Sequence, residues 1–153
     1  MTPAPDPAVP RVRRETTASP DDVWAVLDDG WTYASWVVGA SRVRRVDATW
    51  PAPGSRIHHS VGTWPLLLDD ETQVLECDPG RRLVLQARGR PFGEAQVTLE
   101  VDAAAGGALI TMLEDATHGP GLLVPKPLRQ KAVVLRNAET LHRLALMAEG
   151  RTA

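Results

Sequence analysis

Cysteine is nearly absent from this sequence, since Cys77 is the only one among 153 residues. A single cysteine cannot form an internal disulfide, so the sequence predicts a protein of a reducing compartment, and we expect a cytoplasmic location. Long apolar runs are missing as well, because no segment approaches the roughly 20 apolar residues of a membrane span. The start has neither the basic residues nor the apolar stretch of a secretory signal. We therefore expect a soluble chain without stable membrane insertion.

An excess of charge of either sign is also missing. Seventeen basic residues stand against nineteen acidic ones, which gives a formal net charge of −2. This balance provides no global attraction to nucleic acid or to an anionic membrane. We expect no nucleic-acid partner.

Motifs for nucleotide binding, serine hydrolysis and zinc proteolysis are missing too. The sequence has no GxGxxG after a strand, no Walker A motif, no GxSxG and no HExxH. The acidic run Asp69, Asp70 and Glu71 suggests a metal site at first. Alternation along a strand sends its members to both faces, so we interpret it as a solvated strand end. We expect neither a metal nor a cofactor.

Phenylalanine and tyrosine are scarce, with one residue of each, whereas tryptophan occurs five times. The length indicates one domain, large enough to bury a core without metals or disulfides. Residues 1–10 carry four prolines and no apolar run, which predicts a disordered tail. We expect the single domain over residues 11–150.

The first elements are predicted by local signals. Residues 11–18 are rich in β-branched side chains and predict a strand. Ser19 suits an N-cap and Pro20 the first turn of a helix, which an apolar stripe continues and Gly30 ends. A short second helix follows up to Trp36.

Period-two patterning with frequent turn signals predicts about six strands between residues 42 and 118, joined as an antiparallel meander. Residues 128–149 contain neither Gly nor Pro and predict one long amphipathic helix. Its expected buried stripe comprises Val134, Ala138, Leu141, Leu144, Ala145 and Ala148. The order predicts an α+β fold in which a curved antiparallel sheet of about seven strands wraps around a C-terminal helix, with room for a cavity between them.

Four segments carry a resemblance to a known superfamily: TTASPDDVWAVLDD, SWVVGASRVRRVDATWPAPGSRIHHSVG, TQVLECDPGRRLVLQAR and the final helix. In them the sequence resembles the helix-grip (SRPBCC) superfamily of START lipid-transfer domains, Bet v1-like plant allergens and bacterial polyketide cyclase/dehydrase-like proteins. The resemblance covers about residues 11–149. It implies the fold described above and a cavity for lipids, hormones, polyketides or aromatic compounds, with catalysis in only some members.

Two ionisable residues are candidates for the cavity. His59 shares a strand face with Ile57 and Val61, which predicts that it points inward while His58 points outward. Glu114 shares a face with Ile110 and Met112. Such a carboxylate needs a partner or a proton, so a structural salt bridge is the alternative to a functional role.

The remaining candidates line the long helix and the tryptophan-bearing segments. Asn137, Gln130 and Val134 fall on the inner stripe of the helix, where buried amides require partners from protein, water or ligand. Tyr33, Trp36 and Trp64 are predicted as walls or mouth of the pocket, and Trp64 is favoured because its GTWPL loop does not fit a core position.

Three functions stay open on the sequence alone. The first is binding of a small apolar ligand between sheet and helix. The alternative is a polyketide cyclase or dehydratase with His59 as general base and Glu114 as general acid. A third is a structural domain that meets a protein partner through its outer sheet. A homodimer is the default expectation for the assembly.

Overall fold

The computed structural model describes residues 8–89 and 93–151. The first seven residues of the predicted tail lie outside this part, and residues 8–10 lead directly into the first strand. The elements follow in the order β1 (Arg11–Thr16), α1 (Pro20–Asp28), η1 (Gly30–Thr32), α2 (Tyr33–Trp36), β2 (Ala40–Val46), β3 (Arg56–Val61), β4 (Leu68–Asp78), β5 (Arg82–Gly89), β6 (Gly93–Ala104), β7 (Gly107–His118), η2 (Pro120–Leu123) and α3 (Lys126–Gly150).

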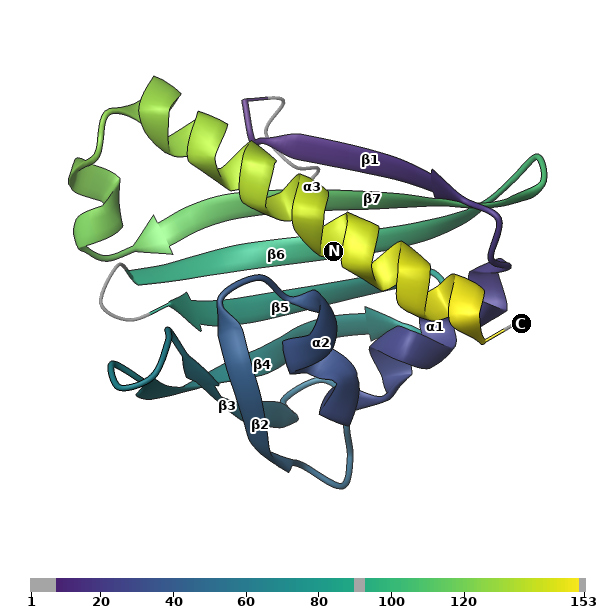
Figure 1. Ribbon diagram of the computed structural model, residues 1–153, viewed down its shortest axis with the longest axis horizontal. Coiled ribbons are helices and arrows are strands. Elements are labelled where there is room, and N and C mark those ends of the chain that lie inside the picture. Colours follow the sequence, from purple (N-terminus) through teal and green to yellow (C-terminus); the bar gives the residue numbers. More distant parts are fainter. Residues whose placement is uncertain (1–7, 90–92, 152–153) are drawn as a thin grey trace.

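The strands form one antiparallel sheet in the order β1-β7-β6-β5-β4-β3-β2 (Figure 1). The predicted α+β helix-grip fold is therefore confirmed, including the six strands after the first helices. Because neighbours run antiparallel, β3, β5 and β7 finish at the end of the sheet where β4 and β6 begin. We call this the hairpin end; it carries the connections 62–67 and 119–125. The turns 79–81 and 105–106 lie at the opposite end.

The start of α1 follows its predicted capping signals. The Asp22 backbone N–H donates to Ser19 Oγ at 3.1 Å, and Pro20 occupies the first turn, where no intrahelical donor is lost. Val23, Val26 and Leu27 are buried on one face of the helix. The stripe therefore fixes how α1 packs against the sheet and α3.

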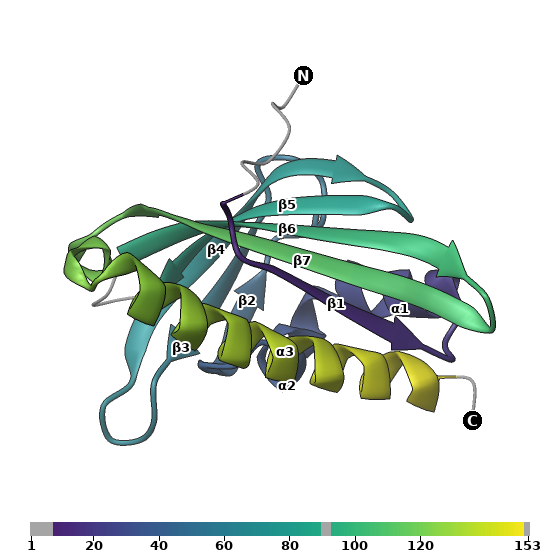
Figure 2. The ribbon, with the colours of Figure 1, turned by 90° about the horizontal axis from the view of Figure 1, so that it is seen from above.

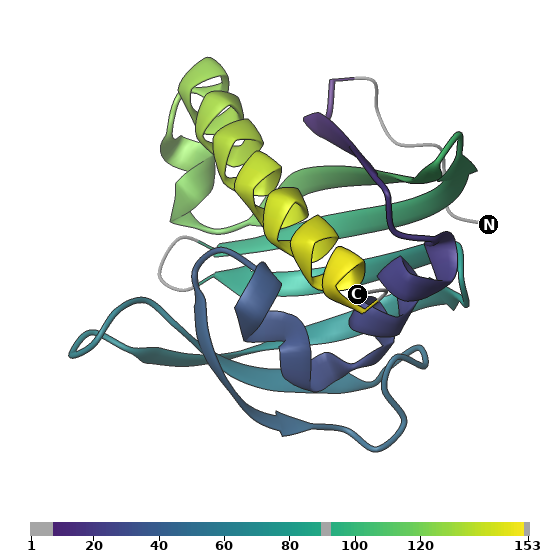
Figure 3. The ribbon, with the colours of Figure 1, turned by 45° about the vertical axis from the view of Figure 1, so that its right-hand side comes forward.

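Alternation sorts the strands into an inner and an outer face. On β6, Val97, Leu99 and Val101 are buried, as predicted. Leu99 lies in register between Leu83 of β5 and Met112 of β7, which forms a continuous apolar row across the sheet. The helices α1, α2 and α3 cover the inner face that carries this row (Figures 2 and 3).

The long helix α3 begins two residues before its predicted start and ends one residue after its predicted end. Its buried residues all come from position 137 onward: Asn137, Thr140, Leu141, Leu144, Ala145 and Ala148. The inclusion of Val134 and Ala138 in the buried stripe was wrong, because both are exposed. Only the second half of α3 has a continuous buried face, so Val134 has no core to enter. No helix in the described residues is long and apolar enough to cross a membrane.

Candidate ligand-binding site

Polar side chains are buried on the inner face of β3 and β4. His59 is 2% exposed and faces Asp70 across the strand pair, and Thr72 lies two residues further along β4. His59 shares its side of β3 with the fully buried Ile57, in agreement with the inward direction expected from alternation. The sheet therefore presents an imidazole, a carboxylate and a hydroxyl to the covered interior.

The short helix α2 adds two aromatic rings to this group. Asp29 caps η1 through the Trp31 backbone N–H at 3.1 Å, and the Thr32 hydroxyl donates to the Val26 carbonyl at 3.0 Å. These bonds fix the turn that follows α1 and direct Tyr33 and Trp36 inward, where both are buried.

A continuous polar chain connects helix and sheet inside the core. The Tyr33 hydroxyl lies 3.0 Å from Thr72 Oγ1, and Thr72 Oγ1 lies 2.9 Å from His59 Nε2. The Tyr33 ring packs against both neighbours, with centroid distances of 5.1 Å to His59 and 5.5 Å to Trp36. We call Tyr33, Trp36, His59 and Thr72 the inner cluster.

Burial changes the proton affinities of this cluster. Desolvation raises the pKa of Tyr33 to about 12, although the hydrogen bond with Thr72 acts in the opposite direction. Desolvation also lowers the pKa of His59 below its usual value, and the nearby charge of Asp70 opposes that shift. At neutral pH the cluster therefore presents a neutral phenol and a neutral imidazole.

Two polar atoms of the inner cluster have no hydrogen-bond partner among the described residues: Trp36 Nε1 and His59 Nδ1. The Ser60 backbone lies close enough to raise the pKa of His59, but no group among the described residues forms a hydrogen bond of ordinary geometry with Nδ1. Leaving a buried donor or acceptor unpaired costs about 1–3 kcal/mol. A bound group that pairs with them would remove that cost.

A second polar group joins β7 to α3. Glu114 is 9% exposed and accepts hydrogen bonds from Arg136 and, at 2.9 Å, from Asn137 Nδ2. Glu114 and Arg136 both act on the pKa of Tyr33, so this ion pair lies within electrostatic range of the inner cluster. The structural salt bridge weighed for Glu114 is present, and Asn137 has a protein partner.

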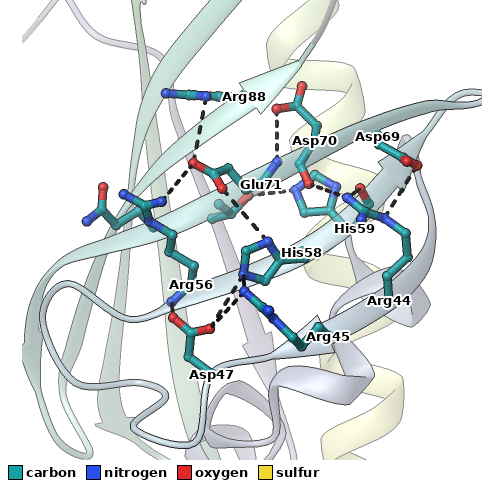
Figure 4. A network of polar contacts seen from close by, with 12 residues as sticks. Arg44, Arg45, Asp47, Arg56, His58, His59, Asp69, Asp70, Glu71 and Arg88 are labelled. Atoms are coloured by element: carbon teal, nitrogen blue, oxygen red, sulfur yellow. Dashed lines mark hydrogen bonds and ion pairs between the residues drawn. The ribbon is translucent and has the colours of Figure 1, made fainter.

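His58 lies on the outer face, as its alternation with His59 requires. Its ring contacts Asp47 at 3.5 Å and Glu71 at 3.8 Å, and Arg45 approaches its Nε2 at 2.9 Å. Figure 4 shows His58 among these charges, with Arg56 and Arg88 on the far side of Glu71. The network holds strands β2 to β5 together on their outer face. Arg44 connects it to the strand of the inner cluster, because its guanidinium donates to the backbone carbonyls of His59 at 3.1 Å and Asp70 at 3.2 Å.

Two further candidates lie away from the inner cluster. Trp64 was predicted as a pocket wall, and this is wrong for the interior: it is 85% exposed, because the connection 62–67 projects beyond the hairpin end of the sheet. Gln130 donates to the Ala8 carbonyl at 3.0 Å. It lines a pocket of about 160 Å³ between residues 8–10, the end of β7 and the first turns of α3. Lys126, Arg129 and Glu114 also border this pocket.

Three residues of this region were missed or misread in the sequence. Asp70, interpreted as part of a solvated strand end, is buried, because it shares its strand face with Thr72 and Val74. Thr72 connects the two rings, yet a lone threonine gives no signal before its neighbours are known. Arg136 lies outside the expected buried stripe of its helix and is exposed, but its long side chain reaches Glu114. No group of three or more potential metal ligands occurs in the described part of the chain.

Comparison with known proteins gives consistent results. The family described as "Polyketide cyclase / dehydrase and lipid transport" matches residues 9–149. A search of curated proteins finds no match. Among solved structures, a protein of Nitrosomonas europaea aligns with a TM-score of 0.73 at 17% identity, covering 96% of this chain and 98% of its own.

Two further structures have informative names. The di-domain ARO/CYC StfQ from the steffimycin biosynthetic pathway aligns with a TM-score of 0.70 at 12% identity, covering 94% of this chain and 52% of its own. The protein Ara h 8.0201 aligns with a TM-score of 0.57 at 12% identity, covering 88% and 96%. At such identities these likenesses concern the fold alone.

Proposed function

Because the chain belongs to the polyketide cyclase/dehydrase and lipid-transport family, we propose that it binds a small, largely apolar ligand between the inner face of the sheet and α3. The observation that carries this proposal is the pair of unpartnered polar atoms, Trp36 Nε1 and His59 Nδ1, on two buried rings that both pack against Tyr33. A ligand with an apolar body and a polar atom near these rings satisfies both features of the site.

The two atoms specify the polar part of the ligand. An indole N–H only donates, so Trp36 requires an acceptor oxygen. His59 Nδ1 donates or accepts according to which nitrogen carries the proton, because Thr72 fits either role at Nε2. A hydroxyl or enolised keto group on an aromatic or polyketide-like skeleton provides both functions in one atom.

A matched pair of probes tests this proposal by calorimetry: 2-naphthol, which carries a hydroxyl, and naphthalene, which does not. We expect 2-naphthol to bind the wild type about two- to tenfold more tightly, which corresponds to one net hydrogen bond. Trp36→Phe and His59→Phe should remove the preference for 2-naphthol and leave the part of the affinity that both probes gain from apolar contacts. Trp31→Phe serves as the control, since Trp31 is exposed on η1. Equal affinity of both probes for the wild type, or no binding of either, would overturn the proposal.

The second candidate function is cyclisation or dehydration of a polyketide-like substrate with His59 as general base. The lowered pKa of His59 favours it, because a neutral imidazole at pH 7 can accept a proton. The contacts of Glu114 do not favour a role as general acid, since one of its oxygens accepts a hydrogen bond from Arg136 and the other from Asn137. Turnover of a poly-β-keto mimic that disappears in His59→Gln while the mimic still binds would establish the enzyme. If no cyclisable substrate is turned over, ligand binding remains the proposed function and the enzyme is excluded.

A further inference from the structure

We propose that the hairpin end of the molecule docks on an anionic lipid surface. The exposed apolar residues of the hairpin end are Trp64, Leu66, Leu122, Leu123 and Leu128, and its cationic residues are Lys126, Arg129 and Lys131 in the first two turns of α3. This proposal goes beyond ligand binding in the interior and does not depend on it.

The topology brings the two apolar segments to one end. The connection 62–67 follows β3, and η2 follows β7; both strands finish at the hairpin end. In all three ribbon views the β3–β4 connection and η2 lie on the same side of the molecule (Figures 1, 2 and 3). Segments separated by more than fifty residues therefore lie at the same end of the molecule, with β5 and β6 between the strands that carry them.

The side chains of these segments point into solvent. Trp64 is 85%, Leu66 79% and Leu123 86% exposed, and Leu128 is also exposed. Single exposed apolar residues are common, but a cluster of large ones on projecting segments marks an interaction site. Tryptophan in particular favours the boundary between headgroups and acyl chains, because its ring is apolar and its N–H is polar.

The charge beside these residues selects the partner. No acidic residue occurs from position 116 to 138, whereas that stretch contains Lys126, Arg129, Lys131 and Arg136. Arg136 is paired with Glu114, while Lys126 and Lys131 form no ion pair with the described residues. On the hairpin itself Asp69 is neutralised by Arg44 at 3.4 Å, although the exposed Asp115 of β7 borders the surface. Apolar residues next to unpaired lysines match an anionic bilayer better than a second copy of this cationic surface.

Vesicle flotation with the full chain tests the proposal without any interior ligand. We expect the protein to float with vesicles of phosphatidylcholine and phosphatidylglycerol at 7:3 in 0.1 M salt. Vesicles of phosphatidylcholine alone, or 0.5 M salt, should lower the bound fraction, since each lysine at such a surface contributes about fivefold to partitioning. A double change, Lys126→Glu with Lys131→Glu, should therefore reduce binding by about 25-fold or more.

Matched variants test how the apolar side chains contribute to vesicle binding. Trp64→Ser with Leu123→Ser should abolish flotation, whereas Trp31→Ser, an exposed tryptophan on η1, should not change it. Arg81→Glu, in the turn at the opposite end of the sheet, makes the same charge reversal as each of the two lysine changes and should not alter flotation. Brominated phosphatidylcholine should quench the fluorescence of bound wild type, and Trp64→Phe should lose that quenching.

Three results would overturn the proposal. The first is that the wild type floats with neither kind of vesicle. The second is that both double variants float as well as the wild type. Alternatively, analytical ultracentrifugation shows a dimer that Leu123→Ser converts to a monomer without lipid, which would make this surface an interface between two copies. Ligand binding by the same variants, measured with 2-naphthol, is expected to be unchanged.

Discussion

Tyr33 is the only tyrosine of the chain, so its ionisation can be followed by absorbance at 295 nm without interference from another phenol. Burial raises its pKa to about 12. We expect no phenolate signal between pH 9 and 11 while the protein remains folded by circular dichroism. Thr72→Val should move the midpoint higher still, since the bond from Thr72 lowers the pKa. A midpoint near 10 in the folded protein would place Tyr33 in contact with water.

At the residue scale, the sequence predicted to which face of the sheet a side chain points, but not which groups it contacts there. Alternation on β3 and β7 was sufficient to place His59 and Glu114 inward, because the neighbouring Ile57 and Met112 mark the apolar face. Thr72 and Arg136 acquire their roles only when β4 meets α2 and when α3 crosses β7. Contacts between elements far apart in the chain leave no local pattern, so these residues could not be predicted.

The joint between α3 and β7 depends on Asn137, which is buried and donates to Glu114 at 2.9 Å. Asn137→Ala removes one of the bonds that satisfy this carboxylate, and we expect a loss of about 1–3 kcal/mol in the free energy of unfolding. Urea denaturation measures the change. The neighbouring Glu139→Ala, which breaks an exposed pair with Arg143, should cost no more than about 0.5 kcal/mol. Equal losses for both variants would contradict a structural role for Asn137.

The edge strand β1 packs closely against the β6–β7 hairpin at Gly107. A Cβ added there would lie 1.9 Å from the Thr16 carbonyl oxygen, so Gly107→Ala must push β1 away from β7. We expect it to cost roughly 3 kcal/mol or more and to lower the Tm accordingly.

Gly106→Ala is the matched control for this change. Its Cβ meets open space, although the φ of +80° adds about 1 kcal/mol of backbone strain. A Gly106→Ala variant at least as destabilised as Gly107→Ala would exclude the steric explanation.

At the scale of elements, periodicity predicted nearly everything that depends on one segment alone. The first strand was expected from its β-branched side chains, the other six from period-two patterning between turn signals, and α3 from its helical apolar stripe. The orientation of α3 was only partly predicted. The stripe through Leu141, Leu144, Ala145 and Ala148 is buried. Val134 is exposed because the first half of the helix has no continuous buried face, and Ala138 is exposed because it lies beside the buried stripe. The length of a helix is encoded locally, but the extent of its burial depends on its neighbours.

For the whole molecule, the overall composition gave no sign of a membrane partner, whereas the distribution of charge along the chain gives one. A net charge of −2 indicates no attraction to an anionic membrane, yet residues 116–138 are entirely free of acidic side chains. Trp64, predicted from the sequence as a wall or mouth of the pocket, is exposed in the connection 62–67, at the same end of the sheet as these cations. The net charge of the whole chain therefore does not indicate the cationic surface, which forms only when the chain folds.

The pH dependence of stability also belongs to the whole molecule. Burial lowers the pKa of His59 in the folded state, so between pH 6.5 and that lowered value the unfolded chain binds the proton and the folded chain does not. The free energy of unfolding should fall as the pH drops below 6.5, by up to about 1.4 kcal/mol per pH unit from this residue, and stay unaffected by it above 7.5. Urea denaturation at pH 5.5, 6.5 and 7.5 measures the slope.

The variant His59→Gln isolates this contribution, because glutamine does not titrate and still offers an amide to Thr72. We expect its stability to change less between pH 7.5 and 5.5 than that of the wild type, by at most about 1.4 kcal/mol. His118→Gln, the same substitution at an exposed position near Glu94, is the matched control. Identical slopes for wild type and His59→Gln would show that His59 protonates as easily folded as unfolded. In that case the imidazole is accessible to water. Water would then also pair with the Trp36 N–H, and this group would no longer favour a bound ligand.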